Sequence, residues 1–303
     1  MRTLWNWLPD RVDARVRFFA WASLVSQTLI IGTGGAVRLT GSGLGCPTWP
    51  KCTEDSFVTT PEMGFHGIIE FGNRLLTFVL IIIAILTFAM VIRMRASRPE
   101  LVRLSVALGL GIPGQAVIGG VTVLTDLNPY VVGLHYLLSA VLVGLAAWFL
   151  FRVRVGPGGG AIAASLPLRI VLGALLGMLT ISILVGILTT GSGPHAGDGG
   201  AARNGLNSEL LQHYHALPSY AVFGLTLLGL FGALSATQSP AIARLRRVLL
   251  ALTAAVGVQI AVGLIQARNG LPELLVGIHM VLASVLVALV VTALLSTRER
   301  PQG

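Results

Sequence analysis

The sequence predicts an all-α integral membrane protein with eight transmembrane helices, built as two tandem, pseudo-symmetric four-helix bundles. Three observations predict this class: eight long apolar runs, a shortage of charge and an internal repeat. Of 303 residues, 54% are hydrophobic and 11% are charged, whereas soluble proteins carry about 25% charged residues. The charges that give the net +9 lie between apolar runs. They therefore indicate orientation in a membrane and not binding of nucleic acid.

Each apolar run is long enough to cross a bilayer, which takes about 20 residues. Lipid cannot satisfy free backbone polar groups, so each run is expected to be helical. The first run is too long for the apolar part of a signal peptide, so no cleavable signal is expected. The predicted spans are 18–37, 67–92, 102–124, 131–151, 168–190, 211–236, 248–266 and 274–296.

The basic residues predict the orientation of these spans. Sixteen of the 21 lysines and arginines fall on the side that carries both termini. The side rich in Lys and Arg faces the cytoplasm. The sequence therefore predicts a multi-pass protein of the cell membrane with both termini in the cytoplasm and long outer loops at 38–65 and 191–210. The five basic residues on the outer side are Arg38, Lys51, Arg74, Arg203 and Arg268.

An internal repeat relates the two halves of the chain. Segments 115–145 and 259–289 align without a gap at an offset of 144, which places His135 on His279. Each repeat holds four spans, an even number, so both halves have the same orientation in the membrane.

A second match, at an offset of 150, aligns residues 40–43 with 190–193, both Thr-Gly-Ser-Gly. The glycine-rich segment 156–160 lies between the halves and suits a hinge, although an ordinary cytoplasmic loop fits it equally well. We therefore divide the chain into an N-terminal half, residues 1–155, and a C-terminal half, residues 156–303.

Histidines recur at the outer ends of the second, fourth, sixth and eighth spans. A single histidine there is most simply a hydrogen-bonded interfacial residue. Two histidines on helices of one bundle, at one depth, can bind a haem iron from both faces, and the repetition favours one haem site in each half. A zinc site would instead need thiolates or carboxylates beside the imidazoles. The histidines are His66, His135, His213, His215 and His279; a sixth, His195, lies in an outer loop and is expected to be solvated.

The predicted pairs are His66 with His135 in the first half, and His279 with a histidine of the sixth span in the second. Aligning Phe65-His66 with Tyr214-His215, at an offset of 149, favours His215. An offset of 147, which selects His213, remains open.

Glu70 is the acidic residue placed most clearly inside a span. A carboxylate in lipid is costly, so Glu70 is expected to face the bundle interior. It lies four residues after His66, about 6 Å deeper on the same helix face. It either pairs with Arg74, four residues further on, or serves a haem as a catalytic carboxylate. The offset of 149 places Ser219 at the equivalent position, so the halves differ chemically.

Both cysteines of the chain, Cys46 and Cys52, lie in the first outer loop. The outer side is oxidising and permits a structural disulfide, which we favour. A redox-active pair is the alternative. Covalent attachment of haem is not expected, because the spacing C-x-x-C-H is absent.

Three segments resemble the haem A synthase family. They are the run 34–52 (GGAVRLTGSGLGCPTWPKC), His66 with the segment 70–74 (EFGNR), and the run 190–198 (TGSGPHAGD). With the eight-span repeat, the resemblance covers nearly the whole chain. It implies an oxidoreductase of haem biosynthesis that oxidises the C8 methyl group of haem O to the formyl group of haem A, for the biogenesis of aa3-type cytochrome oxidases.

The resemblance also implies roles for residues. His215 and His279 would hold a haem b cofactor, and His135 with a histidine of the second span would hold the substrate haem. Glu70 would be the catalytic residue. Many members have a histidine where this chain has Asn73, so either His66 replaces that ligand or His135 holds the substrate iron alone.

The implied partners are haem O, as a lipid-soluble substrate that enters from the bilayer, membrane lipid, haem O synthase, the cytochrome oxidase assembly machinery and an unidentified electron donor. Nucleic acid is not expected as a partner. Arg38 and Arg74 are candidates for the haem propionates, because arginine binds carboxylates in a bidentate manner.

Two other functions are compatible with parts of this pattern. A dihaem cytochrome b that passes electrons from a quinol to a partner explains both histidine pairs but not a carboxylate in one half only. A transporter with parallel repeats predicts a helix broken at mid-membrane, which Pro113 and Pro218 permit.

Overall fold

The structure, a computed structural model that describes residues 2–300, confirms the eight predicted spans. Eight helices are long and apolar enough to cross a membrane, so the chain is a multi-pass membrane protein. Two short 3-10 helices, η1 (Pro61–Met63) and η2 (Ile92–Met94), flank the second span. The spanning helices are α2 (Ala14–Leu39), α3 (Gly64–Val91), α4 (Pro99–Leu124), α5 (Pro129–Val155), α6 (Leu166–Ser192), α7 (Ser208–Ser235), α8 (Pro240–Arg268) and α9 (Glu273–Leu295).

Two features at the helix ends differ from the prediction. Helix α8 begins eight residues before the predicted 248, because its first two turns contain three arginines, which lower the hydropathy there. Ser239 caps this helix by accepting a hydrogen bond from the Ile242 amide, and Arg246 donates to the carbonyl of Ala233 at the end of α7. A short helix α1 (Arg2–Trp7) precedes the first span and was not predicted.

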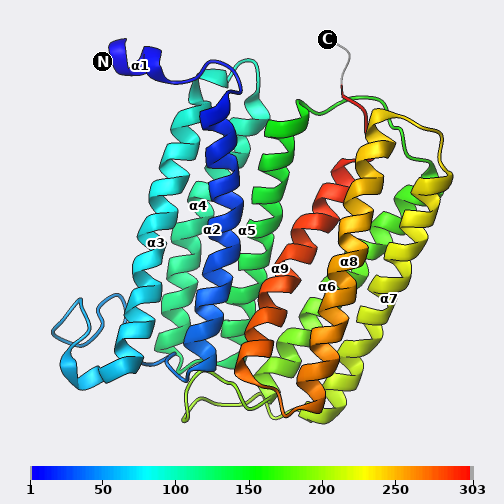
Figure 1. Cartoon of the computed structure of the whole chain (residues 1–303). Coiled ribbons are helices and arrows are strands. Elements are labelled where there is room, and N and C mark those ends of the chain that lie inside the picture. The colour runs from blue at the N-terminus through cyan, green and yellow to red at the C-terminus, as the bar shows by residue number, and fades with distance from the viewer. Residues whose placement is uncertain (1, 301–303) are drawn as a thin grey trace.

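Each half of the chain forms a closed ring of four helices (Figure 1). In the first half, α2 contacts α3, α3 contacts α4, α4 contacts α5, and α5 contacts α2. Helices α6 to α9 form the same ring. The rings meet through α5 and α9, with α2 against α9 and α6 against α5. A parallel two-fold repeat would give these contacts, which supports the proposed division after residue 155.

The ends of the bundle differ in their connections. Helix α1 and the end of α9 lie at one end, and the long loops after α2 and α6 lie at the other (Figure 1). We call these the inner and outer ends, following the predicted orientation.

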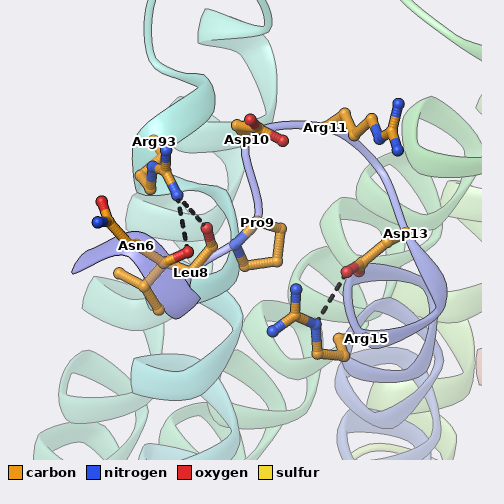
Figure 2. Close-up of a pocket in the computed structure, with 8 residues that line it drawn as sticks. All are labelled: Asn6, Leu8, Pro9, Asp10, Arg11, Asp13, Arg15 and Arg93. Carbon is orange, nitrogen blue, oxygen red and sulfur yellow. Dashed lines mark hydrogen bonds and ion pairs between the residues drawn. The ribbon is translucent and has the colours of Figure 1, made fainter. Parts of the chain in front are cut away.

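The N-terminal segment lies at the inner end beside Arg93 of η2 (Figure 2). Arg93 donates a hydrogen bond of 2.6 Å to the Leu8 carbonyl, and Arg15 pairs with Asp13 at 2.8 Å. These residues line a cavity of about 470 Å³. Because no histidine lines it, this cavity is separate from the predicted haem sites.

The apolar core of the second half lies toward its inner end. The outermost fully buried residue is Pro218 on α7, Val256 on α8 and Ser284 on α9. All three lie on the inner side of His215 and His279. The histidines are therefore placed where the tightly packed core ends.

Candidate haem sites

His215 and His279 face each other inside the second half. Their ring centroids are 6.1 Å apart, with an angle of 69° between the ring planes. They come from α7 and α9, which lie opposite each other in the ring and make no backbone contact. A bond from an imidazole nitrogen to a metal ion is about 2.0–2.1 Å long. Two imidazoles on opposite sides of one ion therefore have centroids about 6 Å apart, which the observed spacing matches.

The hydrogen bonds of this pair also suit metal ligands. Nδ1 of His215 lies 2.9 Å from the Ser182 carbonyl. A carbonyl only accepts, so Nδ1 carries the proton and Nε2 keeps its lone pair, as in most metal-bound histidines. Nδ1 of His279 is buried and has no hydrogen-bond partner in the part of the chain described. Such groups are rare in folded proteins, and this one fits a site built to hold a further group.

Glycines on the neighbouring helices make room for both rings. A Cβ atom at Gly186 would lie 2.9 Å from Cε1 of His215, and one at Gly263 would lie 3.2 Å from Cε1 of His279. Any larger residue would push the imidazoles out of position. His213, the alternative ligand on α7, is exposed, which supports His215.

His135 repeats the surroundings of His279 in the first half. Gln115 donates to the His135 carbonyl at 3.2 Å, and Gln259 donates to the His279 carbonyl at 3.1 Å. A Cβ atom at Gly119 would lie 3.2 Å from Cε1 of His135, and Nδ1 of His135 is likewise buried without a partner among residues 2–300. The prediction from the offset of 144 therefore corresponds to matching local structures.

His66 does not lie at the level of the other histidines, contrary to the predicted pair with His135. Its side chain is exposed, and its Nδ1 lies 2.9 Å from the Ser42 hydroxyl in the outer loop. With Met63 and Asp198 it lines a surface pocket of about 580 Å³ between the outer loops. The pocket is outside the helix ring, so His66 is not positioned as a second ligand in this structure.

Contacts between neighbouring helices show which residue occupies the position of His215. In an antiparallel helix pair, the numbers of facing residues add up to a nearly constant value. On α2 and α3, Ser23 faces Thr87, and Ser42, three residues beyond the end of α2, faces His66. On α6 and α7, Ser182 faces Ser219 and Thr189 faces Leu211.

The sums are 108 and 110 for α2 and α3, and 401 and 400 for α6 and α7. The two sums, about 109 and about 400, differ by the offset between α2 and α6 plus the offset between α3 and α7. Because the first of these offsets is 150, the offset between α3 and α7 is about 141. His215 therefore corresponds to residue 74, within one or two residues, and the offset of 149 used for His66 is wrong. The counterpart falls on Asn73 or Arg74.

Glu70 and Arg74 hold the first outer loop onto α3. Both Nε and Nη2 of Arg74 donate to Oε1 of Glu70, the first at 3.1 Å, and the Cys46 amide donates to Oε2 at 2.6 Å. Arg74 also donates to the carbonyls of Cys46, Thr48 and Lys51 at 2.9–3.1 Å. All five guanidinium N–H donors are thus engaged. In this structure no donor of Arg74 is left for the expected contact with a propionate.

The disulfide between Cys46 and Cys52 is confirmed. Both cysteines are buried. The disulfide closes the loop whose backbone Arg74 holds, so α3 and the loop form one unit.

Arg38 connects the outer loops of the two halves. It donates to the carbonyls of His195 at 2.6 Å and Thr190 at 2.9 Å. The His195 ring lies 2.8 Å from the Leu271 carbonyl, so this histidine is held in place and not simply solvated as expected. These bonds leave three N–H donors of Arg38, two on Nη1 and one on Nη2, for a propionate.

Two alternatives find no support in the described residues. No three His, Cys, Asp or Glu side chains of residues 2–300 gather as a metal cluster of the zinc type. Helices α4 and α7 continue through Pro113 and Pro218, so the broken helix expected of a transporter is not formed at either proline.

Comparisons with known proteins agree with this geometry. The family model COX15-CtaA, described as a cytochrome oxidase assembly protein, matches residues 17–291. Proteins named Heme A synthase are similar over shorter segments. That of Geobacillus thermodenitrificans is 28% identical over 154 residues, 50% of this chain and 48% of that protein. That of Lysinibacillus sphaericus is 29% identical over 143 residues, 47% and 46% of the two. The chain thus spans about half the length of the curated relatives it matches.

Proposed function

The chain belongs to the COX15-CtaA family of cytochrome oxidase assembly proteins, and we propose that it is a haem A synthase. In this proposal it is an oxidoreductase that converts the C8 methyl group of haem O to the formyl group of haem A. The observation that carries the proposal is the facing pair of His215 and His279, whose 6.1 Å spacing suits an iron between them.

His215 and His279 would hold a haem b as the resident cofactor. The Ser182 carbonyl orients one ring, Gln259 fixes the backbone of the other, and Gly186 provides room. When bound, the haem supplies one-electron redox chemistry, which these side chains do not have. The protein contributes ligation, orientation and exclusion of water.

The first half would bind haem O as substrate through His135. The farnesyl tail of haem O is lipid-soluble, so entry from the bilayer between helices suits it. Arg38 remains a candidate for one propionate through the free N–H donors of Nη1 and Nη2. Partners in this step are an electron donor and, for delivery and use of the product, haem O synthase and the oxidase assembly machinery.

Glu70 is the catalytic residue of the proposal. It is 5% exposed, and among the described residues it is the only fully buried carboxylate. Arg74 and the Cys46 amide hold it in one orientation. A fixed carboxylate can stabilise positive charge that develops on a substrate. Oε2 accepts only the Cys46 hydrogen bond, so it keeps a second lone pair on which it can take a proton.

The test is production of haem A in a bacterium that makes haem O but lacks haem A synthase. Expression of this chain is expected to yield haem A in extracted membranes, and His135→Ala is expected to abolish it. A folded, haem-loaded wild-type protein that leaves haem O unchanged in respiring cells would contradict the proposal and favour the dihaem cytochrome.

A further inference from the structure

Asn73 occupies the position in the first half that His215 occupies in the second. It lies on α3, seven residues or about 10 Å deeper than His66, within the one or two residues that the helix contacts allow. Its Oδ1 atom is buried and has no hydrogen-bond partner in the described part of the chain. Buried polar atoms are normally paired, so this one indicates a group that the residue is placed to meet.

The other residues at this level cannot take that role. Arg74 has all its donors engaged by Glu70 and the outer loop. Gly72, Leu75 and Leu76 offer no polar side chain. Helices α3 and α5 lie opposite each other in their ring, as α7 and α9 do. Asn73 is therefore the polar side chain placed across the ring from His135.

The chemistry of a carboxamide differs from that of an imidazole. Imidazole is a good ligand for iron, whereas carbonyl oxygens prefer hard cations such as Mg²⁺ and Ca²⁺. A carboxamide does, however, offer both an acceptor oxygen and two N–H donors. Beside a haem iron, such groups decide whether a small molecule binds there.

We propose that the first half binds haem iron through His135 alone and presents Asn73 to a small ligand, the size of water or dioxygen, on the opposite face. The second half closes both faces with His215 and His279. This inference rests on the proposed function only in that a haem enters the first half. In this inference, Asn73 stands where a second histidine would bind and so leaves one coordination position of the first-half haem iron open.

The test uses the purified full-length protein in detergent, titrated with haem B to two haems per chain, reduced and exposed to carbon monoxide. We expect one of the two haems to bind carbon monoxide, which is half of the total. Asn73→His should supply a second imidazole, convert that haem to the six-coordinate low-spin form and abolish carbon monoxide binding. His66→Ala is the matched control on the same helix and should behave as wild type.

Asn73→Leu covers the case in which Asn73→His does not fold. It should still bind carbon monoxide, but with the C–O stretching band moved to higher frequency by loss of the amide hydrogen bond. If the wild type takes up two haems and neither binds carbon monoxide, the inference is wrong while the proposed function stands. Carbon monoxide binding that appears only in His66→Ala would also overturn it, because His66 would then be the ligand. If no second haem binds, both the inference and haem O binding in the first half fail.

Discussion

The two halves of the bundle have matching helices on one side of their predicted haem sites and different residues on the helix opposite. Helices α4 and α5 reproduce α8 and α9, with a glutamine on the histidine carbonyl and a glycine against the imidazole in each. Helices α3 and α7 do not match in this way, since Asn73 stands where His215 is expected. A repeat can thus preserve the frame that holds one haem ligand while the opposite helix changes the chemistry of the site.

The outer loops of the two halves differ as well. The loop after α2 is closed by the disulfide and held by Glu70 and Arg74, and the corrected register places Leu211 or Gln212, not Ser219, at the position of Glu70. The second half has no carboxylate at that position. The chemical asymmetry predicted from the sequence therefore persists, with a different counterpart residue.

The largest effect is expected from removing an imidazole of the closed site. His279→Ala should eliminate nearly all bound haem b, because a single remaining ligand cannot hold the iron from both faces. The absorption spectrum and haem content of the purified protein measure this. The exposed His213 provides the control, and a comparable loss in His213→Ala would contradict the assignment of His215.

Breaking the Glu70–Arg74 pair should destabilise the first half. Arg74→Gln removes donors to three loop carbonyls and leaves Glu70 without its cation. The side chains of Arg74 and Glu70 are 21% and 6% exposed. We therefore expect the free energy of unfolding to fall by about 3 kcal/mol, the lower end of the range for breaking a buried pair. Thermal unfolding in detergent and proteolysis of the loop report it, with the exposed Arg95→Gln as control. An intact, protease-resistant loop in Arg74→Gln would show that the clamp is dispensable.

A smaller effect is expected from crowding a ligand. Gly186→Ala would place a methyl group 2.9 Å from the His215 ring and should weaken haem b binding about tenfold, the lower limit for residues that support a metal ligand. Gly177→Ala on the same helix is the matched control, because nothing lies within 4 Å of its Cβ position. Equal haem affinity in the two variants would argue against a close fit around His215.

The smallest effect is expected at His66. His66→Ala loses one part-buried hydrogen bond to Ser42, worth about 1 kcal/mol, and should leave the haem content of both halves unchanged. Haem titration of the purified variant checks this. A lost haem in the first half would restore His66 as a ligand.

The sequence predicted the spans and the matching histidines but not the level of His66. Hydropathy detects apolar helices wherever they are long, and the offset of 144 runs without a gap through His135 and His279. The loops that precede α3 and α7 differ in length, spanning residues 40–63 and 193–207. The first residues of α3 and α7 are 144 apart, and the helix contacts give about 141, so the offset of 150 does not continue across these loops. No helical pattern in the sequence records that change. Only contacts such as Ser182 with Ser219 reveal it.

The contacts of Arg74 with the outer loop could not be predicted from the sequence either. The spacing of four residues predicted its pair with Glu70, which the structure confirms. The three loop carbonyls that occupy its remaining donors depend on how residues 46–51 fold back onto α3. The sequence suggested Arg74 as a candidate for a propionate, and in this structure its side chain holds the outer loop.

Extraction of the haems from the purified protein tests the central claim, that the halves bind different haems for different purposes. The protein should be produced in cells that make haem O. We predict haem B together with haem O or haem A in the wild type, and in His135→Ala we predict that haem B remains while haem O and haem A are lost. Haem B as the only haem of a wild-type protein loaded in both halves would contradict the account.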